Sequence, residues 1–593
     1  MEQDKRKLRN RRITIAAVAL LLIAAAAFYF FKPTAVTSYP QHDRAGNTEK
    51  EPKIKQLLED KIRDMVVEAS DSLYRINYTT FKIDLSGGKV RIKNLEIIPD
   101  SAVLNRLIAG KRAPNNVLRI SVPSMTIDGF GFKRTKEGIR FGIDSTHLEQ
   151  PVVSIRNQLR SYNNAPSDPS ALYKAFRGLY TRMLVGKMSI HDLDIKYINK
   201  NRGVTDHLKK VNILATGFVS NPVTVNGKGR TNMTVSYFKL TTPDRLYDIV
   251  AKNLSLRPAD KSLAIAHISV LPRYSKAAFH KQVGFAKDRY HFEIDRVSWK
   301  NIDIDQFIRT QQLFVENQTV GSSWTEIYTN YNYPLKKKQR RNAYPQEKFQ
   351  TIALDLTFRK TNLFNSTVLY RILAGATDQV STLKLSDCNS TIANLTNHSL
   401  TKKRNPKTTV HSKMKVMDAA VMDSWYTFNL TDKSAPVTLY SVMGPMDARN
   451  FNILSKPLAK IEVKKGRINK LETYLKMNEY TATGYVNFYY SDMNIAFLGR
   501  DKNSDTLKRK GFLSFVSNAF LPNDNPRNNG KFRRGIVNLE REPWQSFFEI
   551  QFDASIDGMS SAMMGMYQKK KGRDKNILLN TAKEIAGSNR NKN

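Results

Sequence analysis

The sequence predicts a mainly β protein: an N-terminal transmembrane helix followed by a long, strand-rich region with a few short amphipathic helices. From Tyr78 almost to the C-terminus, apolar and polar residues alternate in many short runs, which is typical of strands with one apolar face. One run, "GGKVRIKNLEIIPDS" (87–101), is repeated with the same pattern as "KSLAIAHISVLPRYS" (261–275). A chain of 593 residues is too long for one compact core, so several domains or one elongated architecture is expected.

The N-terminus predicts a membrane anchor. A basic cytoplasmic tip, residues 1–12, precedes "ITIAAVALLLIAAAAFYFF" (13–31), which carries no charge. As a helix this stretch reaches about 28 Å, close to the roughly 30 Å hydrocarbon thickness of a bilayer. Because the basic cluster is N-terminal, the positive-inside tendency leaves residues 32–593 outside the cytoplasm. The alternative is a cleaved signal peptide, although the stretch is longer than a usual apolar signal region.

A linker and a helix are expected next. Residues 32–52 contain the prolines and polar residues typical of a linker. Residues 53–76 place apolar side chains at helical three- and four-residue spacing, with charges on the other face. This amphipathic helix could lie on a membrane or cover one end of a sheet. Its acidic residues favour the end cover, because helices that lie on lipid usually carry a Lys/Arg face.

The strands begin with a predicted hairpin, in which "YTTFKIDL" (78–85) turns at Gly87 and Gly88. Near the C-terminus, "EYTATGYVNFYY" (479–490) alternates in the same way, and "SFFEIQFDASI" (546–556) also predicts a strand. The other alternating runs are residues 118–130, 188–198, 247–256, 351–358 and 381–396.

Few helices are expected among these strands. Residues 170–185 and 302–312 have helical spacing, and residues 336–345 form a basic loop that ends at a proline. The remaining predicted regions are an N-terminal β-groove region (77–335), a C-terminal β region (346–570) and a basic tail (571–593).

The charge balance is strongly basic. The chain has 95 Lys and Arg against 53 Asp and Glu, a formal net charge of +42. Such a charge attracts nucleic acid, anionic membrane or acidic glycans, or forms a solvated basic surface. Nucleic-acid binding is not expected, because no zinc-finger spacing, basic zipper or RNA-binding strand motif occurs and the anchor places the chain outside the cytoplasm.

No catalytic or metal site is predicted. The nine histidines show no HExxH motif or other metal-ligand spacing, and the single cysteine, Cys388, cannot form an intramolecular disulfide. The sequence contains neither a phosphate loop nor a nucleophile elbow. We therefore expect no enzymatic activity, no metal and no cofactor, although an acid and base pair built from distant segments stays open.

Both ends of the chain resemble the AsmA-like proteins of the Gram-negative envelope. At the N-terminus the likeness lies in the basic tip, the two helices and the hairpin "FKIDLSGGKVRIKNLEIIPDS" (81–101). The resemblance implies an elongated, twisted antiparallel β-sheet curled into an open, repeating groove, similar to that of bridge-like lipid-transfer proteins. It also implies a part in phospholipid traffic toward the outer membrane. The C-terminal segments that carry the likeness are "GRINKLETYLKMNEYTATGYVNFYYSDMNI" (466–495), "FVSNAFLPNDNP" (515–526), "RRGIVNLER" (533–541) and "PWQSFFEI" (543–550).

A sheet rolled into an open trough lines its concave face with one side of each alternating strand. Acyl chains are then expected against the apolar side chains, and headgroups against the basic loop. The alternative is that these are plain core residues of β-sandwiches. The predicted lipid contacts are Phe81, Ile83, Val90, Ile92, Leu263, Ile265, Val486, Phe488, Ile550 and Phe552. The predicted headgroup contacts are Lys336, Lys337, Lys338, Arg340 and Arg341.

These expectations combine into one functional prediction. The protein is a single-pass inner-membrane protein with a cytoplasmic N-terminus and its bulk in the periplasm. It binds and transfers envelope phospholipids and contributes to outer-membrane lipid homeostasis, and an outer-membrane or periplasmic partner protein is a further expectation. The alternative is an envelope structural or acidic-glycan-binding protein without lipid transport.

Overall fold

The structure, a computed structural model, describes most of the chain between residues 70 and 564, together with residues 56, 59 and 60. The described part is mainly β, as predicted, with short helices between the strands. Within residues 70–564 the description omits residues 71, 85, 136–137, 163–182, 202, 220–229, 243, 311, 335–343, 353, 375–378, 501–506, 510–521 and 542–544.

The chain divides into two compact units. The N-terminal unit contains the described residues up to Ile268 together with residues 298–311, and the C-terminal unit contains residues 269–297 and the described residues from Gln312 onward. Strands β12 (Ser262–Pro272) and β13 (Arg289–Ile302) therefore contribute to both units. The division predicted at the basic loop falls inside the C-terminal unit.

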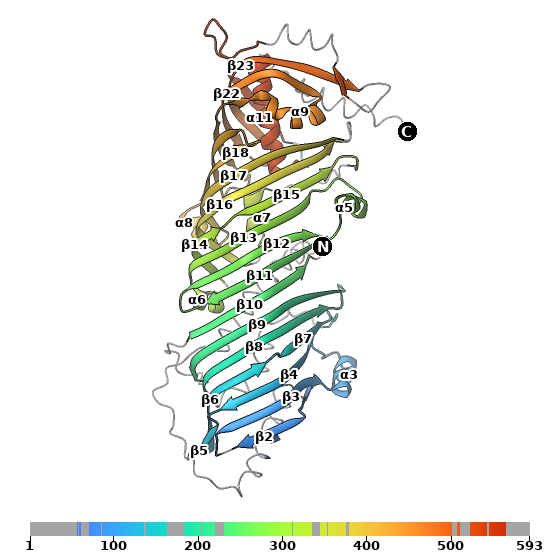
Figure 1. Cartoon of the computed structure of the whole chain (residues 1–593), viewed down its shortest axis with the longest axis vertical. Helices are drawn as coiled ribbons and strands as arrows, with labels where there is room; N and C mark the ends of the chain where they lie inside the picture. The colour runs from blue at the N-terminus through green and yellow to red at the C-terminus, as the bar shows by residue number, and fades with distance from the viewer. Residues whose placement is uncertain are drawn as a thin grey trace. The chain divides into compact units, whose positions relative to one another are not determined.

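The N-terminal unit is built on a large curved sheet (Figure 1). Most neighbouring strands are also neighbours along the chain. Besides β12 and β13, its elements are β1 (Tyr74–Asn77), β2 (Thr80–Asp84), β3 (Lys89–Pro99), α3 (Ser101–Ala109), β4 (Asn116–Asp128), β5 (Gly131–Thr135), β6 (Gly138–Glu149), β7 (Val152–Asn157), β8 (Met183–Asn199), β9 (Val204–Val219), β10 (Arg230–Thr241), β11 (Tyr247–Arg257) and α6 (Ile304–Thr310).

The C-terminal unit also consists of a large sheet, with more helices. Its strands are β14 (Gln312–Val320), β15 (Ser323–Asn330), β16 (Asp355–Ala374), β17 (Gln379–Thr396), β18 (Lys407–Val416), β19 (Ala420–Asn429), β20 (Val437–Met443), β21 (Met446–Asp447), β22 (Ile461–Met477), β23 (Thr481–Arg500), β24 (Leu507–Arg509) and β25 (Gly535–Glu540). Its helices are α5 (Lys276–Val283), α7 (Pro345–Gln350), α8 (Ser399–Arg404), η2 (Ala448–Phe451), α9 (Asn452–Ala459) and α11 (Phe547–Met564).

The repeat seen in the sequence is a structural repeat with three copies. Pro99 ends β3 and Pro272 ends β12, 173 residues later, and Pro445 follows β20 after a further 173 residues. Each proline is followed by a short helical segment and then by a long strand, which is β4, β13 or β22. The first two copies are visible in the sequence, whereas Gly444 and Pro445 interrupt the apolar alternation of the third.

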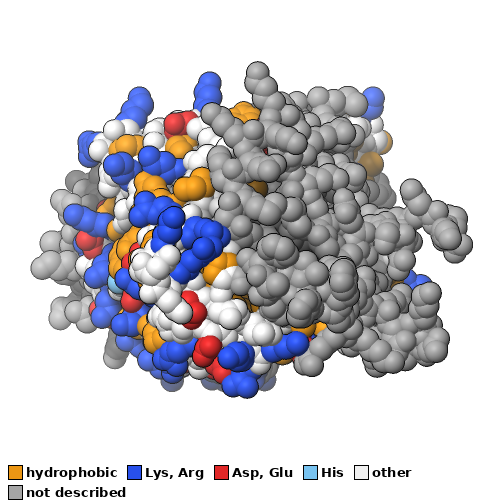
Figure 2. Space-filling model, turned by 90° about the horizontal axis from the view of Figure 1, so that it is seen from above, with side chains coloured by type: hydrophobic (Ala, Val, Ile, Leu, Met, Phe, Trp, Pro, Cys, Tyr) orange, Lys and Arg blue, Asp and Glu red, His pale blue; other side chains and the backbone are white. Residues whose placement is uncertain are grey.

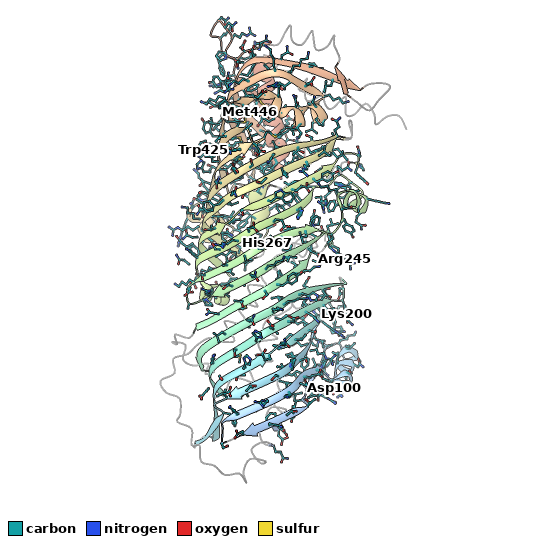
Figure 3. All side chains as sticks on the ribbon, in the orientation of Figure 1. Asp100, Lys200, Arg245, His267, Trp425 and Met446 are labelled. Carbon is teal, nitrogen blue, oxygen red and sulfur yellow. The ribbon has the colours of Figure 1, made fainter. Side chains whose placement is uncertain are left out.

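The helical segments of the three copies begin in the same way. Asp100, Ser275 and Asp447 each lie immediately before a helix, and each side chain accepts a hydrogen bond from a backbone N–H two or three residues later. A cap of this kind satisfies N–H groups that have no partner within the helix. Figure 3 shows Asp100 beside α3 at the edge of the sheet.

A line of residues with left-handed backbone crosses the sheet of the N-terminal unit. A positive φ interrupts the two-residue alternation, so apolar residues before and after it can share one face. In β9, for example, Leu208 and Val211 are both buried although an odd number of positions separates them. The residues of this line are Asn94, Gln150, Asp192, Lys210 and Asn253, with φ between 47° and 52°.

An antiparallel sheet was predicted, but the sheets also contain parallel pairs of strands. Strands β6 and β7 act as one strand broken at Gln150 and Pro151, and both pair in parallel with β8. Strands β14 and β15, broken at Gly321, pair in parallel with β16 in the same way. A parallel pair requires the chain to cross back over the length of the strand, a connection that local alternation does not reveal.

The strand predicted at residues 546–556 is wrong, because these residues belong to helix α11. Phe548 is 64% exposed whereas Ile550 is 1% exposed, so residues two apart do not share a face. Ser546 and Glu549 form a reciprocal capping box, in which each side chain accepts from the backbone N–H of the other. This S-x-x-E signal was present in the sequence and outweighs the apparent alternation.

Two helix predictions also need correction, and one is confirmed. The helix predicted at residues 53–76 does not extend to its expected end, because Tyr74–Asn77 forms strand β1. Met183–Val185, the predicted end of another helix, begins β8, and the rest of that helix lies outside the described residues. Helix α6 lies within residues 302–312, as predicted.

In the part of the chain that the structure describes, no helix combines the length and apolar character needed to cross a bilayer. The basic tip, the predicted anchor at residues 13–31 and the linker lie outside the described residues, as does the basic tail.

Candidate functional site

Two rows of apolar side chains cross the sheet of the N-terminal unit, and we call the face that carries them the inner face. Side chains that are in register on neighbouring strands lie side by side on one face. The first row is Phe81, Ile92, Met125, Leu148, Ile190, Ile213, Met233 and Leu256. The second row is Ile76, Ile97, Ile120, Val153, Ile195, Leu208, Phe238 and Ala251.

The rows form a continuous apolar surface, because no polar residue interrupts either of them over eight strands. At about 4.8 Å between strands, each row extends over roughly 34 Å. Helix α3 packs against the start of the second row, because its Leu104 and Leu107 pack against the same buried side chains as Ile76 and Ile97. Among the described residues, the helices that pack broadly on strands are α9 and α11, both in the C-terminal unit.

The opposite face of the same strands, which we call the outer face, is polar. Beside the first row lie Arg91, His147 and Ser189, which occupy the alternate positions. The Nδ1 atom of His147 is 2.7 Å from the Ser189 hydroxyl, and its Nε2 contacts Glu149. Glu149 also lies 3.2 Å from His191, and its pKa is lowered chiefly by the hydrogen bond from His147. This network stays clear of the apolar rows.

The predicted contacts of the hairpin lie on one face, as expected. Phe81 pairs with Ile92, and Ile83 pairs with Val90, so the four side chains are cross-strand neighbours. Phe81, Val90 and Ile92 are buried, and Ile83 is half-buried. Phe81 and Ile92 begin the first row.

The other predicted contacts of the N-terminal unit lie on β12. Leu263 is buried and Ile265 is half-buried, and their two-residue spacing places them on one face of that strand. Figure 3 shows His267 on the same strand.

The predicted contacts of the C-terminal unit lie in a packed core. Val486 is 0% exposed, and Phe488 and Ile550 are almost completely buried. Ile550 lies on helix α11 itself, and this helix covers β23 so closely that a Cβ added to Gly558 would lie 2.2 Å from Cγ2 of Val486. Phe552 lies on the exposed side of the helix. Sequence alternation identified the face of β23 correctly but could not show that a helix occupies it.

The crossover before β16 joins the same core through Tyr344. Its ring packs edge-on against Phe547 of α11, and its hydroxyl donates to the carbonyl of Asn478 at 2.7 Å. The Arg541 guanidinium lies 5.0 Å from the ring centroid. Burial raises the pKa of Tyr344 to about 12, so the phenol stays protonated and keeps this hydrogen bond at physiological pH.

A row of small hydroxyl residues crosses the covered face of the C-terminal unit, and the sequence analysis did not find it. The row comprises Ser412, Ser424, Ser441 and Thr473, which are in register on four neighbouring strands. All four are buried, and within the described chain the Ser424 hydroxyl has no hydrogen-bond partner. This face therefore differs from the inner face of the N-terminal unit, where the described rows are apolar throughout.

A second missed feature is a buried carboxylate with three cations. Glu326 of β15 is 4% exposed and lies 2.8 Å from the Lys276 Nζ and 2.7 Å from the Arg371 Nη1. A third cation, Arg289, lies 3.7 Å away. The cluster ties α5 to three strands, which is a structural role that spacing in the sequence does not reveal.

The predicted headgroup contacts, Lys336, Lys337, Lys338, Arg340 and Arg341, lie outside the described residues. Elsewhere, Figure 2 shows Lys and Arg side chains spread over the visible described surface, with apolar side chains between them. The described residues contain no group of three or more His, Cys, Asp and Glu that could hold a metal ion. Burial raises the pKa of the Cys388 thiol to about 11, which leaves it a poor nucleophile.

Comparison with protein-family models, with curated proteins and with solved structures found no match.

Proposed function

We propose that the protein binds lipids on the inner face of its N-terminal unit and transfers them within a cell envelope. The observation that carries this proposal is the pair of apolar rows, each unbroken over eight strands. A surface of this kind matches the hydrocarbon of a lipid, because removing each CH₂ group from water contributes about 0.8 kcal/mol. Phospholipids suit it because their acyl chains lie along the rows while their headgroups stay in water.

The rest of the proposal rests on the sequence. Residues 13–31 would anchor the chain in the inner membrane with residues 32–593 in the periplasm, and the basic loop at residues 336–345 would contact headgroups. The proposed role is outer-membrane lipid homeostasis, without enzymatic turnover, together with an outer-membrane or periplasmic partner. The location of the lipid differs from the sequence-based expectation in one respect: Val486 and Phe488 of β23 belong to the same buried core as Ile550 of α11.

The test is native mass spectrometry of the full-length protein extracted in detergent. Co-purified phospholipid supports the proposal, whereas bound saccharide without lipid contradicts it. The informative variant is Ile190→Asp, which places a carboxylate in the first row at a half-buried position. Its matched control is Leu214→Asp, because Leu214 is 41% exposed on the outer face. We expect Ile190→Asp to lose most bound lipid and Leu214→Asp to retain it.

A second variant covers the case in which Ile190→Asp does not fold. Ile190→Trp keeps the row apolar but fills space beside it, so the protein should fold while binding less lipid than the wild type. Circular dichroism and a cooperative thermal transition establish folding for each variant. Equal lipid content in the folded Ile190 variants and in Leu214→Asp contradicts the proposed location.

A further inference from the structure

The outer face of the N-terminal unit carries a row of mostly basic residues on five neighbouring strands. Arg119 is in register with Ser154, Ser154 with Lys196, Lys196 with His207, and His207 with Lys239. We call these five residues the basic row. It lies directly behind the second apolar row, because each member is the chain neighbour of a member of that row.

One member of the basic row, His207, lies in an unfavourable environment. It is in register with Lys196 and Lys239 on the two neighbouring strands. The pKa of His207 is lowered, first by burial and then by Lys209, Lys196 and Lys239, while Asp194 opposes the shift. The Nδ1 atom of His207 is buried and has no hydrogen-bond partner among the described residues. A feature that costs stability in this way is often retained for binding.

The surroundings of the basic row combine cations with an aromatic ring. A parallel row places Tyr237 between Lys209 and Lys252. Two carboxylates lie nearby: Asp248 pairs with Lys239 at 3.0 Å, and Asp194 accepts from the backbone N–H of Lys210 at 3.0 Å.

We infer that the basic row binds a linear acidic polysaccharide. Neighbouring members are about 4.8 Å apart, so the row presents a line of positive charge roughly 19 Å long to a chain that carries repeated carboxylates. Charge-assisted hydrogen bonds from lysine and arginine would hold the carboxylates. The Tyr237 ring offers an apolar surface to a sugar ring, and the Ser154 hydroxyl offers a polar partner to its hydroxyl groups.

A line of charge fits this ligand better than it fits a lipid surface. Helices and loops that bind bilayers usually combine basic residues with apolar side chains that insert between lipids. Within the basic row the cross-strand neighbours are cations, a histidine and a serine, and the apolar residue in register with Lys239 at its end, Val250, is buried and cannot insert into a bilayer. The inference is independent of lipid binding, because it uses residues on the other face of the sheet.

The test measures binding of fluorescent polygalacturonate oligomers to the full-length protein in detergent. We compare the double variant Lys196→Gln/Lys239→Gln with the double variant Lys407→Gln/Lys413→Gln. Lys407 and Lys413 are exposed lysines on β18 of the C-terminal unit. Both pairs remove the same charge. We expect the first pair to weaken binding about tenfold, and the control pair to change it less than about twofold. The salt dependence of binding should also become shallower in the first pair only.

The same variants separate binding from a structural role. Circular dichroism and a cooperative thermal transition establish folding of each variant, because Lys239→Gln also removes the ion pair with Asp248. Equal loss of binding in both lysine pairs overturns the inference. Anionic phospholipid vesicles, polyglutamate and single-stranded DNA serve as competitors at equal charge concentration. Displacement by any of them at a lower concentration than unlabelled polygalacturonate assigns the row to another ligand class and overturns the inference.

Discussion

At the scale of single residues, the buried Glu326 carboxylate is the residue whose contribution to stability is the most clearly defined by its contacts. Its side chain is 5% exposed, whereas those of Lys276 and Arg371 are 41% and 34% exposed. Water can therefore solvate two of the cations but not the carboxylate. The arrangement is stable only while the carboxylate and its cations remain together, because an unpaired buried charge is strongly unfavourable.

We expect Glu326→Gln to lower the free energy of unfolding by about 2 to 3 kcal/mol, somewhat less than the loss of a fully buried ion pair. Removing the charge leaves the Arg289 side chain, which is 10% exposed, without its anionic partner. The matched control is Glu316→Gln, since Glu316 pairs with an Arg359 side chain that is 70% exposed and should contribute less than about 1 kcal/mol. Chemical denaturation measures both, and equal losses contradict the prediction.

At the scale of elements, helix α11 depends on close contact between glycines. A Cβ at Gly535 would lie 1.8 Å from the carbonyl oxygen of Gly558, and a Cβ at Gly558 would meet Val486. Phe547, Ile550, Ala554 and Ala562 follow the helical spacing and bury the same side of the helix. Small residues thus let the helix lie directly on β23 and β25.

We predict that Gly558→Ala destabilises the protein by about 1 to 3 kcal/mol, although alanine is the better helix former. The added methyl group has no room against Val486, so the helix must shift. Combining it with Val486→Ala, which removes the clashing methyl, should cost less than the sum of the two single changes. Phe552→Ala, on the exposed side of α11, serves as the control. A stabilised Gly558→Ala protein contradicts the packing described here.

At the scale of the whole molecule, several carboxylates have lowered pKa values, and this sets the response to acid. The backbone N–H of Val103 is the main cause for Asp100, and the side chains of Lys384 and Lys470 are the main causes for Asp418 and Glu472. A group whose pKa is lower in the folded state stabilises that state above its unfolded pKa, near 4. The contribution is lost as pH falls through the folded value.

The thermal midpoint should therefore fall only slightly between pH 7 and about pH 5, where protonation of His207 is disfavoured in the folded state, and fall steeply below about pH 4. Glu472 raises the pKa of Lys470, which stays charged in this range, so protonation of the carboxylates accounts for the loss below pH 4. Scanning calorimetry at fixed ionic strength measures it. A midpoint that rises on acidification, or that falls mainly between pH 7 and pH 5, contradicts this account.

The threefold repeat predicts how the molecule tolerates deletion. Removing residues 100–272 joins Pro99 to Arg273, so that β3 leads into α5 and β13 as it now leads into α3 and β4. We expect this protein to be soluble, with a cooperative unfolding transition, because strand, proline and helix keep their order. A deletion of residues 100–186, about half of the repeat, joins β3 directly to the interior of β8 and leaves the repeat out of register, so this protein should aggregate. Similar behaviour of the two proteins contradicts a modular repeat.

The sequence by itself determined the β class, the hairpin at Phe81 to Ile92, and the face of β23 that is buried. These features depend on contacts between near neighbours, and a two-residue period records them directly. It also contained the capping box at Ser546 and Glu549, which predicts α11 when it is given more weight than alternation.

Which strands pair, and what covers them, follows from the folded chain alone. Strand β8 pairs in parallel with β6, and β16 pairs in parallel with β14. These pairings, like the burial of Val486 under α11, join residues far apart in the chain. The two apolar rows exist because left-handed residues such as Asp192 and Lys210 return apolar side chains to one face at the same place in successive strands. Alternation within one strand cannot show this, because the register between strands is set by pairing and not by local sequence.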